Sequence, residues 1–216
     1  MAEAGAQETD TATRTSADRI RVYLVRHGQV VGHEEGRFNG HTDVETSEQG
    51  REQLEQVARY LQEEDIHHLY CSDLKRAVAG AEIISRGRNL TPVALKELRE
   101  MNLGIFDGLT FREVEERFKT IFKEWRKDFL HYRLPQGECL LDIHHRVCGA
   151  LEGILKDKKG CNVAIVAHGG VNRIILSHAL GMDPKDAFRL EQDYGCLNVI
   201  DYYPNWTVVK LMNRIF

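Results

Sequence analysis

The chain lacks the features that mark several classes of protein. No apolar run approaches the roughly 20 residues that a membrane-spanning helix needs. Residues 1–18 have no apolar core of the kind that a secretory signal peptide carries. The formal net charge of −4 is far from the basic balance that is typical of nucleic-acid-binding proteins. We therefore expect no membrane partner and no nucleic-acid partner.

Cysteine is present but shows no organised pattern. There are five cysteines, an odd number, and none of their spacings is that of paired metal ligands. Free thiols are typical of a reducing compartment, so we expect a cytoplasmic protein. The pairs His67–His68 and His144–His145 have no evident metal partner in the sequence, and we expect them on the surface or on helices. The sequence thus predicts no metal site and shows no internal repeat. The cysteines are Cys71, Cys139, Cys148, Cys161 and Cys196.

The length and the 42% hydrophobic content of the chain are typical of one α/β domain. We expect a disordered tail over 1–18, where residues are small and polar, and a single domain over 19–216. Alternating helices and strands predict a three-layer αβα fold with a mostly parallel sheet of about six strands and helices on both faces. Pro204-Asn205 predicts the turn of a final hairpin, with an antiparallel strand at the edge. Expected strands are 20–25, 67–71, 91–94, 162–167, 196–202 and 206–212, and expected helices are 47–63, 74–86, 111–129, 139–156 and 170–180.

Histidines follow two of these predicted strands at their carboxyl ends. The first strand runs into Arg26-His27-Gly28, and the strand over 162–167 runs into His168-Gly169-Gly170. Because parallel strands end at the same edge of a sheet, we expect both imidazoles to face one site. Arg76 falls in the first turn of a helix that follows another strand, and it should point toward the same edge.

These residues resemble the histidine phosphatase superfamily, which includes the cofactor-dependent phosphoglycerate mutases. The run Leu24-Val25-Arg26-His27-Gly28 is similar to the family signature, and the resemblance extends from about residue 21 to about residue 200. Ser72-Asp73-Leu74-Lys75-Arg76-Ala77 resembles the motif that supplies a second arginine, and the stretch 98–104 resembles the one that holds an acidic residue, here Glu100.

The resemblance implies a role for each residue. His27 would be the nucleophile, Arg26 and Arg76 would clamp phosphate oxygens, and His168 would act from the other side of the phosphoryl group. Glu100 would be the general acid, with its neighbour Glu97 as a solvent-exposed alternative.

The chemistry explains why these residue types are needed. An imidazole with an unperturbed pKa near ~6.5 is a nucleophile at neutral pH, and arginines neutralise the charge of a phosphate monoester. A carboxyl group beside a phosphate dianion retains its proton more readily, which suits a general acid. No carboxylate accompanies the histidines at metal-ligand spacing, so we expect a reaction without metal or cofactor.

The segment 29–43 resembles the substrate loop of the family, with two departures. Gln29 stands where many members have Glu, and His33 stands where most have an Asn that donates to phosphate. A histidine could donate in the same way, or it could merely lie in a polar loop. We assign substrate binding to His33, Asn39, Gly40 and Gly169 together with the two arginines.

The interval 111–137 carries an aromatic stripe at helical spacing. Packing in the core is the default for such a stripe, and a small helical cap over the site is the alternative that the family suggests, because this interval varies there and shapes substrate choice. The following turn, 134–139, resembles a family motif with Cys139 in place of Ser. The stripe consists of Phe118, Ile121, Phe122, Trp125 and Phe129.

We expect a phosphatase rather than a mutase. The mutases carry Arg-His-Tyr-Gly after the acidic residue, whereas this chain has Met101-Asn102-Leu103-Gly104 and so lacks the cation expected for the glycerate carboxylate. The chain looks more like α-ribazole phosphatases and broad small-molecule phosphatases. The predicted function is hydrolysis of a small phosphorylated metabolite through a phosphohistidine, with α-ribazole 5′-phosphate as a candidate. The alternatives are a phosphoglycerate mutase and a catalytically weak phosphate-binding or interaction module. A homo-oligomer is left open.

Overall fold

The computed structural model describes residues 18–216. The predicted disordered tail therefore lies outside the described residues except for Asp18. Within them, every helix is too short or too polar to cross a bilayer. The strands are β1 (Ile20–Arg26), β2 (His68–Ser72), β3 (Val93–Leu95), β4 (Asn162–Ala167), β5 (Leu197–Tyr203) and β6 (Trp206–Arg214). The α-helices are α1 (Glu48–Tyr60), α2 (Lys75–Ser85), α3 (Phe111–Arg117), α4 (Lys119–Lys127), α5 (Leu140–Leu155) and α6 (Gly169–Ala179), and short 3₁₀ helices cover His33–Glu35, Lys96–Leu98, Gly104–Phe106 and Pro184–Arg189.

The strands form one mixed sheet in the order β3-β2-β4-β1-β5-β6. The first four strands of this order are mutually parallel, whereas β5 and β6 are antiparallel to their neighbours. The mostly parallel six-stranded sheet is thus confirmed. The hairpin at Pro204-Asn205 is confirmed as well, and β6 forms the edge.

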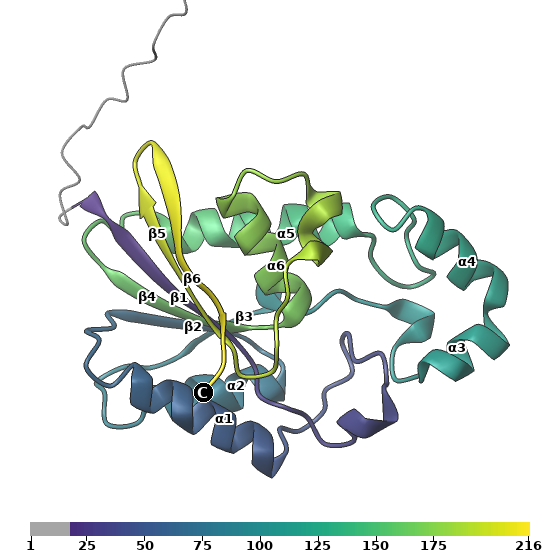
Figure 1. Cartoon of the computed structure of the whole chain (residues 1–216), viewed down its shortest axis with the longest axis horizontal. Coiled ribbons are helices and arrows are strands. Elements are labelled where there is room, and N and C mark those ends of the chain that lie inside the picture. The colour runs from purple at the N-terminus through teal and green to yellow at the C-terminus, as the bar shows by residue number, and fades with distance from the viewer. Residues whose placement is uncertain (1–17) are drawn as a thin grey trace, which may run out of the picture.

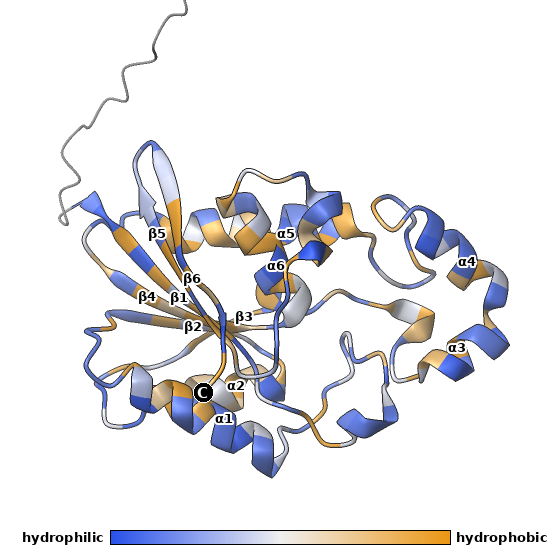
Figure 2. Ribbon diagram, viewed as in Figure 1, coloured by the Kyte–Doolittle hydropathy of each residue, from blue (hydrophilic) through white to orange (hydrophobic). Residues whose placement is uncertain are grey.

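Helices cover both faces of the sheet, because alternate side chains of a strand point to opposite faces. On β1, Val22 and Leu24 belong to a core cluster with α5 and α6, whereas Tyr23 and Val25 belong to a second cluster with α1 and α2. Figure 1 shows these helix pairs on opposite sides of the strands, and Figure 2 shows the apolar strands between them. The predicted three-layer arrangement is confirmed. The face of α5 that packs on the sheet includes Leu140, Ile143, Val147, Leu151 and Ile154, which recur at helical spacing and are buried.

The single helix predicted over 111–129 is wrong, because the segment forms two helices. Phe118, with φ −132° and ψ 32°, ends α3 and precedes α4. Its ring packs against Phe106, and Phe106 also contacts Phe122 and Trp125 from α4. The break is therefore stabilised by a third apolar cluster. This cluster lies in the part of the chain that Figure 1 shows beside the sheet, around α3 and α4.

The topology brings the two predicted histidines together. β1 and β4 are adjacent and parallel, and Arg26 pairs in register with Ala167. His27 and His168 follow these residues directly, so they leave the sheet side by side at its carboxyl edge. β2 lies on the other side of β4 and leads into α2, which carries Arg76.

Candidate active site

The imidazoles of His27 and His168 face each other at this edge. Their ring centroids are 5.1 Å apart, and both side chains are buried. His27 Nδ1 lies 2.8 Å from the carbonyl oxygen of Gly28. A carbonyl only accepts, so Nδ1 carries the proton and donates it, and Nε2 keeps its lone pair. The nitrogen that could attack an electrophile is therefore set by a backbone contact.

Burial, reinforced by the two neighbouring arginines, keeps both histidines neutral. Burial, together with the positive charges of Arg26 and Arg76, lowers the pKa of His27 well below its ordinary value. Burial and the same two cations, with His27 itself, also lower the pKa of His168. Desolvation is the largest cause in each case. A neutral His27 at physiological pH is the form that a nucleophile requires.

Arg76 is held in one orientation by four acceptors. It is only 1% exposed, and its Nε donates to Nδ1 of His168 over 3.2 Å. Its terminal nitrogens donate to backbone carbonyls of Asn39, Gly40 and Thr42 at 2.7–3.1 Å. His168 Nδ1 thus accepts, which leaves the proton on Nε2, and this buried donor has no partner among residues 18–216.

Arg26 comes from the tip of β1 and is fixed differently. One terminal nitrogen donates to the Gln192 carbonyl over 2.5 Å, and the guanidinium lies 3.9 Å from the ring centroid of Tyr194. Its Nε is buried and unpartnered within the described chain. Leaving a buried charged donor unpaired is costly, so an anion in this place would be bound favourably.

Glu100 approaches the same site from the segment that follows β3. Its Oε2 accepts from the backbone N–H of Gly170, at the start of α6, over 2.9 Å, and its Oε1 accepts from its neighbour Met101. A Cβ at position 170 would lie 2.3 Å from Oε1, so only glycine allows this approach. A carboxyl group is therefore placed at the N-terminus of α6, next to the two histidines. The side chain of Glu97, in contrast, is exposed to solvent.

The loop 39–42 wraps around Arg76 and is anchored by Asp107. The Asp107 carboxylate accepts from the backbone N–H groups of Gly40, His41 and Thr42 at 2.6–3.1 Å. Asn39 lines the cavity, whereas Gly40 contributes its carbonyl to Arg76 and lies behind the lining. Asp107 is a positioning residue that the sequence analysis did not identify.

A cavity of about 270 Å³ opens above these groups. Its lining includes most of the predicted site residues, and His168, which is fully buried beside His27, is not among them. His33 and Gly40 are also absent from the lining; the His33 imidazole contacts Glu34 at 3.0 Å, and its ring lies 6.5 Å from the ring of Tyr194. Phosphate binding by His33 stays a prediction. The lining residues are Arg26, His27, Val30, Arg37, Phe38, Asn39, Arg76, Glu100, Met101, Leu103, Trp125, Phe129, Gly169, Gly170, Arg173, Phe188 and Tyr194.

Three lining residues escaped sequence analysis. Tyr194 stacks on Arg26, Arg173 lies one turn into α6, and Phe188 packs against Phe129 at a centroid distance of 4.9 Å. Burial and the charge of Arg26 lower the pKa of Arg173. The only available signal for Arg173 was its position, five residues after His168 on the same helix. Phe188 lies within a 3₁₀ helix and Tyr194 in a turn, and such segments carry no periodic pattern.

Comparisons with known proteins point to one family. A family model described as "Histidine phosphatase superfamily (branch 1)" matches residues 22–215. The chain is 34% identical over 165 residues to "Phosphoglycerate mutase-like protein 4" of Arabidopsis thaliana. The matched region covers 75% of this chain and 72% of that relative. It is 31% identical over 192 residues to "Probable phosphoglycerate mutase GpmB" of Yersinia pestis, which covers 85% of each chain. The crystal structure of the alpha-ribazole phosphatase from Shigella flexneri is similar with a TM-score of 0.85 and 25% identity, covering 90% of this chain and 96% of that one.

Proposed function

The chain belongs to the histidine phosphatase superfamily, and we propose that it is a phosphomonoester hydrolase that forms a phosphohistidine at His27. Proteins of this superfamily are phosphatases or mutases. The observation that carries the proposal is the pair of unpartnered buried donors, Arg26 Nε and His168 Nε2, beside a neutral imidazole whose Nε2 is free. A phosphoryl group between them would supply the missing acceptors and present its phosphorus to His27.

In the first step, Nε2 of His27 attacks phosphorus, and the bond from phosphorus to the ester oxygen breaks. Arg26, Arg76 and His168 neutralise the charge on the phosphoryl oxygens. Glu100, in its protonated form, gives its proton to the departing oxygen. The products of this step are the alcohol, a phosphorylated His27 and an ionised Glu100.

In the second step, water attacks the phosphohistidine. The Glu100 carboxylate takes a proton from the water, the bond between phosphorus and His27 breaks, and inorganic phosphate leaves. Glu100 and His27 return to their starting forms. All of these steps use side chains only, so the proposed reaction needs no metal and no cofactor.

We place the leaving group of the substrate at the side of the cavity that residues 111–137 form. This segment would act as a small helical cap. Trp125 and Phe129 from this interval line the cavity together with Phe38, Met101 and Leu103. An apolar wall beside the phosphate clamp suits a metabolite with a flat apolar portion. α-Ribazole 5′-phosphate, with its benzimidazole, has this character and is the first candidate substrate.

A phosphoglycerate mutase is the second candidate, because two further cations line the cavity. Arg37 and Arg173 could in principle receive a glycerate carboxylate. Each already contacts an acidic partner, since Arg37 pairs with Glu35 at 2.6 Å and Arg173 pairs with Glu191 at 3.4 Å. Both also donate to backbone carbonyls. These contacts favour the hydrolase.

The proposed compartment is the cytoplasm. All five cysteines are free thiols, and four of them are buried in the folded domain. Free thiols persist where the surroundings are reducing. The proposed partner is a small phosphorylated metabolite.

The decisive assay measures phosphate release and isomer formation from the same reaction mixtures. The substrates are α-ribazole 5′-phosphate, 3-phosphoglycerate, methyl phosphate and p-nitrophenyl phosphate, with and without a chelator. We expect chelator-insensitive phosphate release that His27→Ala abolishes. Conversion of 3-phosphoglycerate into 2-phosphoglycerate faster than phosphate release would establish the mutase instead. Phosphate binding without turnover of any substrate would indicate the interaction module.

A further inference from the structure

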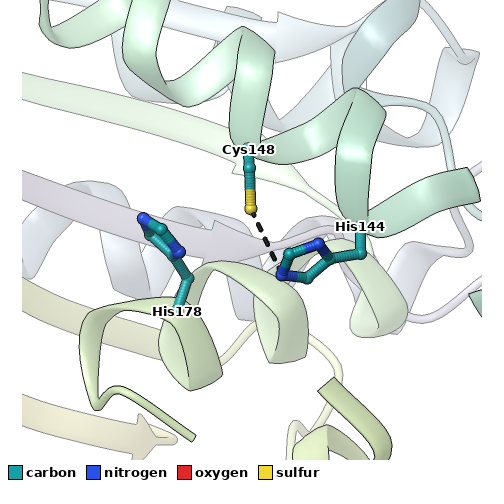
Figure 3. Close-up of side chains that lie close together, drawn as sticks. All are labelled: His144, Cys148 and His178. Carbon is teal, nitrogen blue, oxygen red and sulfur yellow. Dashed lines mark hydrogen bonds between the residues drawn. The ribbon is translucent and has the colours of Figure 1, made fainter. Parts of the chain in front are cut away.

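A second group of reactive side chains lies between α5 and α6, outside the cavity described above. His144 and Cys148 come from α5, and His178 comes from the last turn of α6 (Figure 3). Their ligand atoms all lie within 4.8 Å of one another. Among the described residues 18–216, this is the one cluster of at least three His, Cys, Asp or Glu side chains close enough to hold a metal ion.

The fold creates this juxtaposition. His144 and Cys148 are four residues apart on a helix, so their side chains lie one above the other on the same face. α5 and α6 pack together on one side of the sheet, which brings the end of α6 to that face. Figure 3 shows His178 reaching from α6 toward the pair on α5. The sequence prediction that the pair His144–His145 has no partner missed this contact, because His178 lies 34 residues further along the chain.

The distance between the two ligand atoms on α5 matches a tetrahedral ion. His144 Nε2 lies 3.6 Å from Cys148 Sγ. With typical Zn–N and Zn–S bonds of about 2.0–2.1 Å and 2.3 Å, two ligands of a tetrahedral zinc lie about 3.6 Å apart. The His178 ring lies 6.4 Å from the His144 ring, between centroids, and its side chain is exposed. A small rotation of this exposed side chain would complete the set.

The protein contacts of His144 leave its ring available to a ligand. Its Nδ1 is buried and has no hydrogen-bond partner within the described chain, and its Nε2 contacts only the thiol. A neutral imidazole is the form that binds a metal.

We propose that His144, Cys148 and His178 bind one zinc ion, with the fourth position open to water. Two imidazoles and a thiolate without any carboxylate select a borderline-soft ion such as Zn²⁺ over Mg²⁺ or Ca²⁺. On binding, the Cys148 thiol releases its proton to solvent and its sulfur coordinates the ion. No electron is transferred in this step. Because His178 is exposed, the zinc ion can reach the site from solvent on that side.

This site is independent of the phosphate site. His178 follows His168 by ten residues on α6, which corresponds to about 15 Å along a helix. No cysteine lines the active-site cavity. The ion would join the C-terminal half of α6 to α5 and would stabilise the fold, while phosphate release would continue without it.

The test titrates the full-length, tag-free and metal-free protein with Co²⁺, which reports a thiolate ligand by its charge-transfer absorption, and then with Zn²⁺. We expect one Co²⁺ per chain with a thiolate band, displacement by Zn²⁺, and a Tm raised by about 5–10 °C at Zn²⁺ a hundredfold above Kd. His27→Ala should behave like the wild type, which excludes binding in the active site. His145→Ala, which alters the exposed neighbour on the same helix, is the matched control.

Two variants decide the outcome. Cys148→Ser should abolish the thiolate band, and His178→Ala should weaken Co²⁺ binding by more than the roughly 10–100-fold that loss of an outer-sphere partner costs. Position 178 is exposed, so His178→Ala is expected to fold normally, and circular dichroism verifies this. Absence of the band in the wild type, or wild-type affinity in either variant, would overturn the proposal.

Discussion

The two ends of the active-site cavity are built in different ways. At the phosphate end, Arg76 and His27 follow strands of the central sheet and are held by backbone carbonyls. At the proposed leaving-group end, Trp125 and Phe129 come from a segment beside the sheet and are held by ring packing, with centroids 4.9 Å apart. Directional contacts fix the first end, and apolar contacts fill the second.

This difference separates chemistry from substrate choice. Groups that touch the phosphoryl oxygens act on every phosphomonoester, because every substrate carries the same group. Side chains that touch the remainder of the substrate act only on those that fill the apolar wall. Substitutions at the phosphate end should therefore slow the reaction of every substrate, whereas substitutions at the other end should slow only some. The following variants test this separation.

Arg76→Ala should give the largest and most general loss. Removing this buried clamp takes charge-assisted donors from the transferring group and should lower kcat by about 10²–10³-fold for methyl phosphate and aromatic substrates alike. Lys should rescue poorly because it lacks the planar fork. The control is Lys75→Ala, which alters an exposed neighbour paired with Glu45. A loss confined to one class of substrate would break the proposed separation.

Glu100→Gln should give a loss that depends on the leaving group. Methyl phosphate has a poor leaving alkoxide and should lose about 10²-fold or more in kcat, whereas p-nitrophenyl phosphate needs little protonation and should change much less. Glu97→Gln, on an exposed side chain of the same segment, should change neither rate. Equal losses on both substrates would give Glu100 an electrostatic role and make His168 the first candidate for the proton donor.

Trp125→Ala should give a smaller loss restricted to the apolar end. We expect kcat/KM to fall about tenfold for an aromatic phosphomonoester and to stay nearly constant for methyl phosphate, as removal of one apolar contact predicts. Trp125→Phe keeps an aromatic ring beside Phe106 but removes the second ring of the indole and its N–H, which is buried without a hydrogen-bond partner among residues 18–216, so its loss should be smaller than that of Trp125→Ala. Trp206→Ala, on the distant hairpin, is the control. Equal losses on both substrates would show that position 125 acts on the phosphate end.

The smallest expected effect is on stability at mildly acidic pH. The pKa values of His27 and His168 are lowered in the fold, so below pH ~6.5 the unfolded chain binds protons that the folded chain does not. Stability is therefore lost as the pH falls, by about 1.4 kcal/mol for each histidine at one pH unit below its ordinary pKa. Urea unfolding at pH 7.0 and 5.5 measures this loss, which His27→Asn should reduce and the exposed His145→Ala should not. An unchanged loss in His27→Asn would contradict the buried neutral histidine.

Sequence patterns predicted the sheet more reliably than they predicted the cavity. β1 and β4 each contain an unbroken apolar run, 22–25 and 163–167, so their positions and the meeting of His27 with His168 followed from parallel strands. The break at Phe118 was missed because a helical period continues through it, and the ring contact with Phe106 that stabilises the break is a tertiary one. Asp107, Tyr194 and Arg173 were missed for the same reason, since their roles arise from contacts between distant segments. His33 is a different case: its position in the motif predicted a phosphate contact, but the motif alone did not determine where the side chain points.

The central claim is that His27 carries the phosphoryl group during turnover. Quenching the reaction without acid, followed by digestion and mass spectrometry, should find an added phosphoryl group, about +80 in mass, on the peptide that contains His27. His27→Ala should lack this adduct and the activity, and Arg76→Lys should accumulate less of it. An active enzyme without the adduct, or an adduct on another residue that persists in His27→Ala, would contradict the account.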